Sequence, residues 1–190
     1  MSNHQRQSIR IIGGKWKGRK ISFPEQLDVR PTGNKIRETL FNWLHGELSN
    51  AKCLDLFSGS GALGLEALSR GAKYVRFIEK NNKTARYIKK SLSEFEKEVT
   101  GEEVICADAI EWIQKNNEVF DIVFIDPPFN GNQIYEICQK VEATAMAERL
   151  IYLEWHSDID SSLLPKKWKL TKQKNLDQCF LLFARGIKTI

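Results

Sequence analysis

The stretch from residue 53 to residue 64, CLDLFSGSGALG, constrains the fold of this chain more than any other. A short apolar run ends in Asp55 and is followed by a glycine-rich turn and a segment with helical character. This order is typical of an α/β domain that presents a small ligand at the carboxyl end of a strand. Gly59, Gly61 and Gly64 fit the spacing G-x-G-x-x-G, in which the missing side chains permit a tight turn and close approach of the backbone to a ligand.

Two other interpretations of this loop have to be considered. A glycine turn between a buried strand and a helix can be purely structural, with no ligand. A phosphate-binding P-loop is disfavoured because Leu65 and Glu66 stand where a lysine and a hydroxyl residue would be needed. We therefore do not expect hydrolysis of a nucleoside triphosphate.

Strands and helices are predicted to alternate after residue 52, which indicates βαβ units and a parallel, doubly wound sheet in an α/β, Rossmann-like fold. The apolar runs predict strands at 53–57, 74–78, 103–106, 122–125 and 150–154, and the helical periods predict helices at 62–70, 85–95, 109–115 and 134–147. The tail differs, since 168–173 and 179–183 look like paired strands joined through 175–178. A terminal antiparallel hairpin is a departure from the parallel sheet of a nucleotide-binding dehydrogenase.

The size and composition of the chain fit one globular domain without a structural metal. Its 190 residues leave no room for a second catalytic domain, no apolar run approaches membrane-spanning length, and the polar start lacks the core of a signal peptide. We expect a cytoplasmic protein. The cysteines are interpreted as structural, and the histidines make no metal-ligand spacing with them; these residues are Cys53, Cys106, Cys138, Cys179, His4, His45 and His156.

The positive charge is concentrated near the start of the chain. The formal net charge is +5, and residues 1–50 hold nine Lys/Arg and four Asp/Glu, so the rest sums to zero. We interpret residues 1–34 as a basic arm for nucleic acid and residues 35–190 as the catalytic domain; a solvated tail is the alternative. Alternation in 9–12 and 20–23 predicts a small hairpin. Trp16 in its turn could stack on an unpaired base or pack against the domain.

One amphipathic helix is expected over residues 35–48, after a start that Thr32 or Asn34 could cap. Leucines and an isoleucine recur every four residues, and this apolar face should cover the sheet. The opposite face would offer Arg37 to solvent or ligand.

Four consecutive predicted strands are each followed by an acid: Asp55, Glu79, Asp108 and Asp126. The carboxyl ends of parallel strands share one edge, where ligands bind, although any single acid there could merely cap a helix or open a turn. Glu79 lies twenty residues after Gly59, a spacing that suits the ribose of NAD or of S-adenosylmethionine. Asp55 would repel a pyrophosphate, whereas S-adenosylmethionine has no phosphate and carries a cationic sulfonium and an amino group. The acids therefore favour S-adenosylmethionine.

The sequence Asp126-Pro127-Pro128-Phe129 is the most specific chemical feature of the chain. The exocyclic amine of a nucleobase is a poor nucleophile until acceptors hold its N–H groups. A carboxylate at Asp126 and a rigid carbonyl at Pro127 could supply these acceptors, and Phe129 could stack on the base. The alternative is a proline-stiffened turn without chemistry.

Together, several motifs resemble the bacterial 16S rRNA guanine-N2 methyltransferase family over nearly the whole chain. The motifs are the glycine loop from Asp55, Asp126-Pro-Pro-Phe, the leading RIIGGKWKGR from Arg10, Arg30-Pro-Thr and RETLFN from Arg37. The family commonly has Thr-Asp after its Arg-Pro-Thr, whereas this chain has Gly33-Asn34.

The resemblance implies a seven-stranded sheet with an antiparallel last strand, S-adenosylmethionine as cofactor, and rRNA of an assembling small subunit as substrate. The implied cofactor residues are Asp55, Phe57, Ser58, Gly59, Gly61, Glu79, Lys80, Asp108 and Ala109. The implied catalytic residues are Asp126, Pro127, Pro128 and Phe129. The expected RNA contacts are Arg10, Lys15, Trp16, Lys17, Arg19, Arg30, Thr32 and Arg37.

A monomer is expected, with no membrane and no metal. Two alternatives remain open at this point. One is an amino-methyltransferase that acts on adenine N6 or on another nucleic acid. The other is an RNA-binding assembly factor, or a cofactor-dependent reductase, without methyl transfer.

Overall fold

The structure is a computed structural model, and it describes residues 6–24, 33–95, 101–128, 133–155, 159–175 and 179–185. Its centre is a seven-stranded sheet in the order β5-β4-β3-β6-β7-β9-β8. The neighbours from β5 to β7 run parallel, and β9 runs antiparallel to both β7 and β8. The strands are β3 (Lys52–Asp55), β4 (Tyr74–Glu79), β5 (Glu102–Cys106), β6 (Phe120–Ile125), β7 (Ala147–Trp155), β8 (Trp168–Asn175) and β9 (Cys179–Arg185). The predicted doubly wound sheet and its terminal antiparallel hairpin are confirmed.

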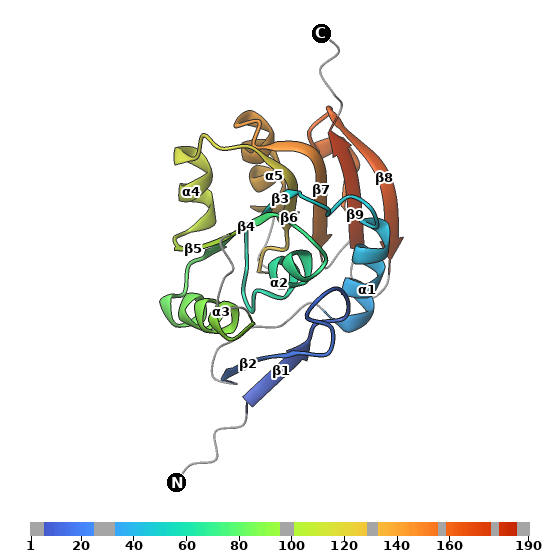
Figure 1. The fold of residues 1–190 in the computed structure, drawn as a ribbon. Coiled ribbons are helices and arrows are strands. Elements are labelled where there is room, and N and C mark those ends of the chain that lie inside the picture. Colours follow the sequence, from blue (N-terminus) through green and yellow to red (C-terminus); the bar gives the residue numbers. More distant parts are fainter. Residues whose placement is uncertain are drawn as a thin grey trace.

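Helices cover both faces of this sheet, as Figure 1 shows. They are α1 (Asn34–Trp43), α2 (Ala62–Ser69), α3 (Asn82–Phe95), α4 (Ala109–Lys115) and α5 (Gln133–Ala143), with a short 3-10 helix at Ser161–Leu163. The side chains of α1, α2 and α3 form one apolar core with one face of the sheet, and those of α4 and α5 form a second core with the other face. None of the helices in the described ranges is long and apolar enough to cross a bilayer.

Two helices end earlier than their apolar periods predict. The helix α1 stops at Trp43, with Leu44 as its C-cap and a turn that includes Gly46 at φ +85°. The helix α5 stops at Ala143, two residues before Ala145 adopts a left-handed φ of 54°. A residue in this conformation breaks the helical hydrogen-bond pattern, so apolar periodicity alone overestimates the helix length.

The N-cap of α1 is Gly33, and it makes no side-chain cap hydrogen bond. The prediction that Asn34 could cap this helix is wrong, because the Asn34 Oδ1 accepts a hydrogen bond from the Arg37 Nη2 at 2.6 Å. The other predicted cap, Thr32, lies outside the described residues.

The predicted hairpin is confirmed, with β1 (Arg6–Arg10) paired antiparallel with β2 (Lys20–Pro24), but its first strand lies earlier than the predicted residues 9–12 and ends at Arg10. It is not a detached arm. Its side chains Ile9, Ile11 and Ile21 are buried in the same apolar core as α1, α2 and α3. The role of residues 1–34 in binding RNA therefore remains a prediction about a segment that also completes the core.

Cys53, Cys106 and Cys138 are free thiols, and two of them behave as small hydrophobic residues. Burial raises the pKa of Cys53 and of Cys138 well above the usual range, so both stay protonated. The third, Cys106 at the end of β5, is exposed rather than part of the core.

Candidate cofactor and substrate site

Asp55 ends β3 and is 2% exposed. Its Oδ2 accepts a hydrogen bond from the backbone N–H of Gly64 at 3.0 Å. Burial and, to a smaller extent, the negative charges of Asp126 and Glu79 together raise the pKa of Asp55 to about 7, although the hydrogen bond from Gly64 lowers it. A buried carboxyl group among other carboxyl groups is poorly stabilised as an anion, so a cationic ligand would favour its ionised form.

The glycine loop after β3 has the predicted geometry. Gly59 and Gly61 have φ values of 49° and 77°, in the left-handed region that favours glycine. The loop is tied to the sheet by Ser58, whose backbone N–H donates to the carbonyl of Ile78 at 3.0 Å and whose hydroxyl donates to the carbonyl of Asp55 at 2.8 Å. The residue before it, Phe57, is half-buried.

The third glycine of the motif, Gly64, serves helix packing. A Cβ atom at this position would lie 2.2 Å from the ring of Phe77 on β4. Only glycine therefore lets α2 approach the sheet this closely.

Glu79 at the end of β4 lies directly against the glycine loop. Its Oε2 accepts from the backbone N–H of Gly59 at 2.9 Å, and its Oε1 accepts from the backbone N–H of Asn81 at 2.7 Å. Burial raises the pKa of Glu79, and these two hydrogen bonds and the neighbouring Lys80 oppose the shift. Gly59 and Glu79 are twenty residues apart in the sequence but are in contact, because Gly59 follows β3 and Glu79 ends β4, and these two strands are adjacent and parallel.

Asp108, after β5, is the N-cap of α4. Its Oδ1 accepts from the backbone N–H groups of Ile110 at 2.9 Å and Glu111 at 3.2 Å. The capping interpretation is therefore correct for this acid, and the next residue, Ala109, is buried. A contact between Asp108 and a cofactor base remains a prediction.

Asp126 follows β6, which is the direct neighbour of β3 in the sheet. The negative charge of Asp126 raises the pKa of both Asp55 and Tyr152. Asp126 therefore lies near the carboxyl ends of β3 and β7. Pro127 is buried and Pro128 is exposed. The fourth residue of this motif, Phe129, lies outside the described residues.

A fifth acid at the same edge, Glu154 on β7, was missed. It is 2% exposed, and its Oε2 accepts from the hydroxyl of Tyr152 at 3.0 Å. Burial and the charges of Glu154 and Asp126 raise the pKa of that hydroxyl well above its usual value. Because β6 and β7 are parallel and Ile125 pairs with Leu153, Asp126 and Glu154 both lie at the carboxyl ends of these neighbouring strands. The strand-end rule, applied to the fifth predicted strand, would have found it.

The prediction that Arg37 contacts RNA is wrong. Its side chain is 0% exposed, and its Nη2 donates to the carbonyl of Arg10 at 2.9 Å as well as to Asn34. Its Nη1 forms an ion pair with the Glu66 Oε2 at 3.4 Å. Arg37 therefore holds the hairpin on the domain and does not face a ligand.

Glu66, in the middle of α2, is the anchor of the hairpin. This fully buried carboxylate accepts from the backbone N–H groups of Ile12 at 2.8 Å and Gly13 at 2.7 Å. It also accepts from the Arg70 Nε at 2.8 Å, in addition to its pair with Arg37. We call this group of Glu66, Arg37, Arg70 and the two backbone N–H groups the Glu66 cluster.

Trp16 is 2% exposed and packs against Phe95, with 5.1 Å between the ring centroids. Stacking of this residue on a base is therefore wrong, and packing against the domain is confirmed. Its backbone N–H donates to the Ser69 Oγ at 3.0 Å. The backbone of Gly14 also lies against α2, because a Cβ atom at this position would be 1.8 Å from the Ser69 carbonyl oxygen.

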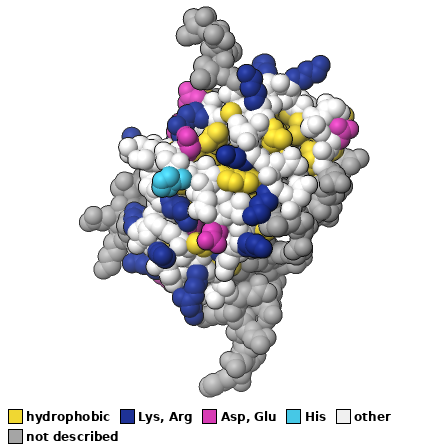
Figure 2. Space-filling view, turned by 90° about the vertical axis from the view of Figure 1, so that its right-hand side faces the viewer, with side chains coloured by type: hydrophobic (Ala, Val, Ile, Leu, Met, Phe, Trp, Pro, Cys, Tyr) yellow, Lys and Arg dark blue, Asp and Glu magenta, His cyan; other side chains and the backbone are white. Residues whose placement is uncertain are grey.

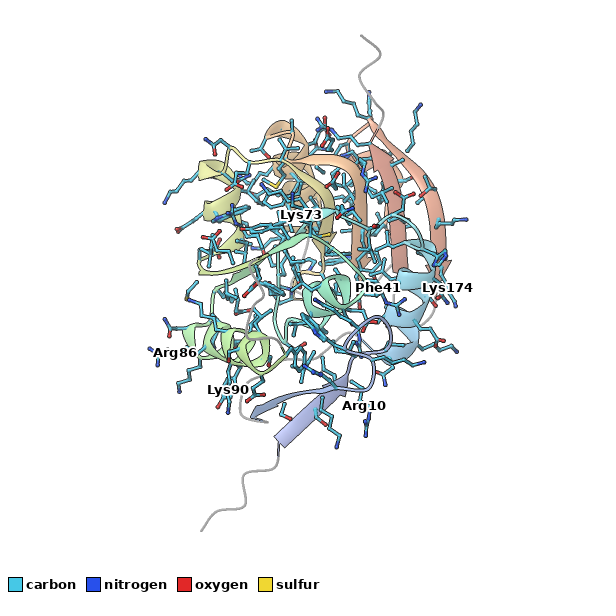
Figure 3. All side chains as sticks on the ribbon, in the orientation of Figure 1. Arg10, Phe41, Lys73, Arg86, Lys90 and Lys174 are labelled. Atoms are coloured by element: carbon cyan, nitrogen blue, oxygen red, sulfur yellow. The ribbon has the colours of Figure 1, made fainter. Side chains whose placement is uncertain are left out.

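The hairpin cations Arg10, Lys15, Lys17, Arg19 and Lys20 are exposed, and Figure 3 shows Arg10 at the outer side of the hairpin. The Arg19 guanidinium donates to the carbonyl of Phe95 and lies 5.5 Å from the centroid of its ring, and the Lys15 Nζ lies 4.8 Å from the centroid of the Trp16 ring. Arg30 and Thr32 lie outside the described residues. Within the described ranges, no group of three His, Cys, Asp or Glu side chains is arranged to hold a metal ion.

Known proteins share both this sequence and this fold. Residues 9–185 match the family described as "Conserved hypothetical protein 95". The chain is 40% identical to Ribosomal RNA small subunit methyltransferase D of Buchnera aphidicola over 178 residues, covering 91% of this chain and 92% of that protein. It is 39% identical to the protein of the same name from Escherichia coli over 182 residues, covering 93% and 90%.

Two solved structures have the same architecture over nearly their whole length. The protein yhhF from Escherichia coli superposes with a TM-score of 0.86 at 35% identity, covering 96% of this chain and 100% of that chain. The protein HI0767 from Haemophilus influenzae superposes with a TM-score of 0.80 at 34% identity, covering 94% and 99%. With the match over residues 9–185, these relatives show that the chain belongs to the Conserved hypothetical protein 95 family, which includes the proteins named ribosomal RNA small subunit methyltransferase D.

Proposed function

We propose that this protein transfers a methyl group from S-adenosylmethionine to the exocyclic N2 amine of a guanine in 16S rRNA. Its family relatives are named as methyltransferases of small-subunit ribosomal RNA, which supports this class of reaction and of substrate. The observation that carries the chemistry is the position of Asp126-Pro127-Pro128 at the end of β6, beside Asp55 at the end of β3. An amine-binding motif therefore adjoins the strand end expected to hold the methyl donor.

The residues at this edge suit S-adenosylmethionine better than a phosphate-bearing cofactor. The donor supplies an electrophilic methyl group on a cationic sulfur. Asp55 and Glu79 are carboxyl groups whose pKa values are raised by burial, so a cation nearby stabilises their ionised forms. A pyrophosphate beside them would add negative charge. In our proposal Asp55 and the Gly59–Gly61 turn hold the amino-acid end, Glu79 holds the ribose, and Asp108 with Ala109 adjoins the adenine.

Asp126 and Pro127 would act on the substrate amine. Their carboxylate and carbonyl oxygens can accept the two N–H groups of the guanine amine, which concentrates its lone pair toward the methyl carbon. The bond from nitrogen to carbon forms as the bond from sulfur to carbon breaks, and the surplus proton on nitrogen leaves to the Asp126 carboxylate or to water. Catalysis is by alignment, with no covalent intermediate on the protein.

The setting of the reaction is also part of the proposal. The substrate is 16S rRNA in an assembling small subunit in the cytoplasm, and the enzyme acts as a monomer. The target base must be unpaired or extruded, because an amine inside a duplex cannot reach a buried donor.

Methylation of small subunits isolated from cells that lack the gene tests the reaction. The purified protein and labelled S-adenosylmethionine are added, and the rRNA is digested to nucleosides. We expect N2-methylguanosine. N6-methyladenosine would move the assignment to an adenine amino-methyltransferase, and no methylated nucleoside would contradict both.

Asp126→Ala tests the role of the motif. We expect turnover to fall by on the order of a hundredfold, because the amine loses its acceptor, while calorimetry shows unchanged cofactor affinity. Glu148→Ala, at an exposed acid near the opposite end of β7, is the matched control. Wild-type turnover in Asp126→Ala would refute the role.

A further inference from the structure

Strand β8 is one edge of the sheet, and it carries three lysines on the side of α1. Lys172 pairs with Leu182, which belongs to the core beneath α1, α2 and α3. Lys169 pairs with Ala184, two residues further along β9 and therefore on the same face. Lys174 reaches α1 directly, since its Nζ lies 3.2 Å from the Thr39 Oγ1.

A β-bulge creates this alignment. The register of β8 against β9 shifts between Leu170 and Lys172, so Thr171 is an extra residue in β8. Leu170 pairs with Phe183 of the opposite core, and without the bulge the strict alternation of a strand would place Lys172 on that opposite face too. The bulge thus turns Lys172 to the face that already holds Lys169.

The line of lysines continues onto α1. Thr39, the contact of Lys174, donates its hydroxyl to the carbonyl of Lys35 at 3.0 Å, and the Lys35 side chain is exposed one helical turn away. We call Lys169, Lys172, Lys174 and Lys35 the β8–α1 lysine track. Figure 2 looks onto this side of the molecule and shows Lys and Arg side chains distributed over it from top to bottom.

The charge of the track is only weakly compensated. Lys167, just before β8, is paired with Glu142 at 3.2 Å. Among the residues that the structure describes, no such carboxylate pairs with Lys169 or Lys172, and both are exposed. The exposed acid Glu38 belongs to α1 and follows Lys35 by three residues.

The track leads toward the proposed active edge. Because β9 is antiparallel to both β7 and β8, the strands β7 and β8 are parallel, and their carboxyl ends lie at one edge. Lys174 is therefore at the same edge as Asp126, three strands away in the sheet order, or about 15 Å at the usual strand spacing.

We infer that the β8–α1 lysine track binds the phosphate backbone of an rRNA segment that flanks the target guanine. This inference rests on the proposed function. Lys169 and Lys174 are separated by roughly 15 Å along the strand, which is long enough to contact several phosphates of one RNA strand. Such contacts position the RNA without reading its sequence, and they would complement the cations of the hairpin.

A protective role for these lysines is the competing explanation. Lysines on an edge strand prevent the unpaired backbone from pairing with a second sheet, and a bulge has the same effect. The two roles differ in the sign of charge that they require. Glutamate protects an edge as lysine does, whereas only a cation binds phosphate.

The test compares Lys169→Glu/Lys172→Glu with a control of the same charge change, Lys115→Glu/Lys140→Glu, on the α4 and α5 side. Binding to 16S rRNA and to small subunits is measured by fluorescence anisotropy over a range of salt concentrations. We expect the β8 variant to lose about tenfold in affinity or more, and the slope of log affinity against log salt to fall by about 1 to 2. The saturating turnover and the cofactor affinity should match those of the wild type.

Lys169→Arg/Lys172→Arg should keep wild-type affinity, and thermal melts and size-exclusion chromatography check that each variant is folded and monodisperse. Equal affinities of the β8 variant and the control would overturn the inference and leave edge protection as the role. Nucleoside analysis of the wild-type reaction is scored separately. If no methylated nucleoside forms, the proposed function fails, whereas selective loss of rRNA binding in the β8 variant would still support the track.

Discussion

Asp55 lies before the start of α2 and Glu66 lies within this helix. Both carboxyl groups are buried, but the protein stabilises their negative charges in different ways. Glu66 accepts two backbone N–H groups and pairs with Arg37 and Arg70, so its negative charge is compensated within the protein. Asp55 has one backbone N–H donor, from Gly64, and its charged neighbours Asp126 and Glu79 are themselves acids. Glu66 is therefore a structural acid, whereas the environment of Asp55 suits a cationic ligand.

The contacts of Glu66 also show that the hairpin sequence serves to attach the hairpin to the domain. Much of the motif from Arg10 to Arg19 provides atoms for docking: the backbone at Ile12 and Gly13 meets Glu66, and Trp16 fills a site against Phe95. Deleting the hairpin would therefore damage the core as well as any RNA contact. Single charge changes on its exposed side are the sharper probe.

The largest effect is expected for Glu66→Ala. Removing the acid leaves Arg37 buried without its ion pair and two backbone N–H groups without an acceptor, which should lower the free energy of unfolding by about 3 to 5 kcal/mol. Urea denaturation measures this change. Glu66→Gln keeps an acceptor oxygen and should lose less, and Glu94→Ala, at an exposed acid of α3, is the neutral control. A loss below about 1 kcal/mol for Glu66→Ala would show that the Glu66 cluster does not anchor the hairpin.

A smaller, pH-dependent effect is expected for Asp55→Asn. The folded pKa of Asp55, about 7, is above its ordinary 3.8, so its contribution to stability is present at low pH and is lost as pH rises through 7. Relative to Asp55→Asn, the wild type should therefore lose stability between pH 4 and pH 8, by about 4 kcal/mol at most. Urea denaturation at several pH values measures this difference, and a pH-independent difference would contradict it.

The same variant tests cofactor binding. Because a cationic ligand favours ionised Asp55, wild-type affinity for S-adenosylmethionine should increase as pH rises from about 5.5 to about 7.5, with release of a proton on binding. Asp55→Asn should bind about tenfold more weakly or worse at the upper end and should lack this rise. Calorimetry in buffers of different ionisation enthalpy measures both quantities. Equal pH profiles for the two proteins would remove Asp55 from the cofactor site.

The smallest effect is expected for Lys17→Gln on the exposed side of the hairpin. One lost phosphate contact should weaken binding to 16S rRNA a few-fold and lower the salt slope by about 1, with no change in stability. Anisotropy titrations measure the affinity, and Lys17→Arg is the matched control. An unchanged slope would mean that the hairpin, although anchored by Glu66, does not present this charge to RNA.

The order of the elements and the main site positions could be predicted because they depend on local patterns. Alternating apolar runs locate the strands, and parallel strands necessarily bring Asp55, Glu79, Asp108 and Asp126 to one edge. The left-handed glycines of the loop follow from the same motif. Helix ends were less predictable, because caps and single residues such as Ala145 terminate a helix whose apolar period continues.

The sequence by itself determined the doubly wound sheet, the glycine loop and the acids along its carboxyl edge, because strand ends and tight turns are encoded by neighbouring residues. Only the tertiary structure decided which charges are internal. Arg37 belongs to the polar side of its helix by periodicity, yet it is buried because the hairpin closes over it, and Glu66 meets backbone groups more than fifty residues away. Likewise, the bulge at Thr171 aligns the lysines of β8. Burial and strand register depend on contacts between distant segments, which no local pattern specifies.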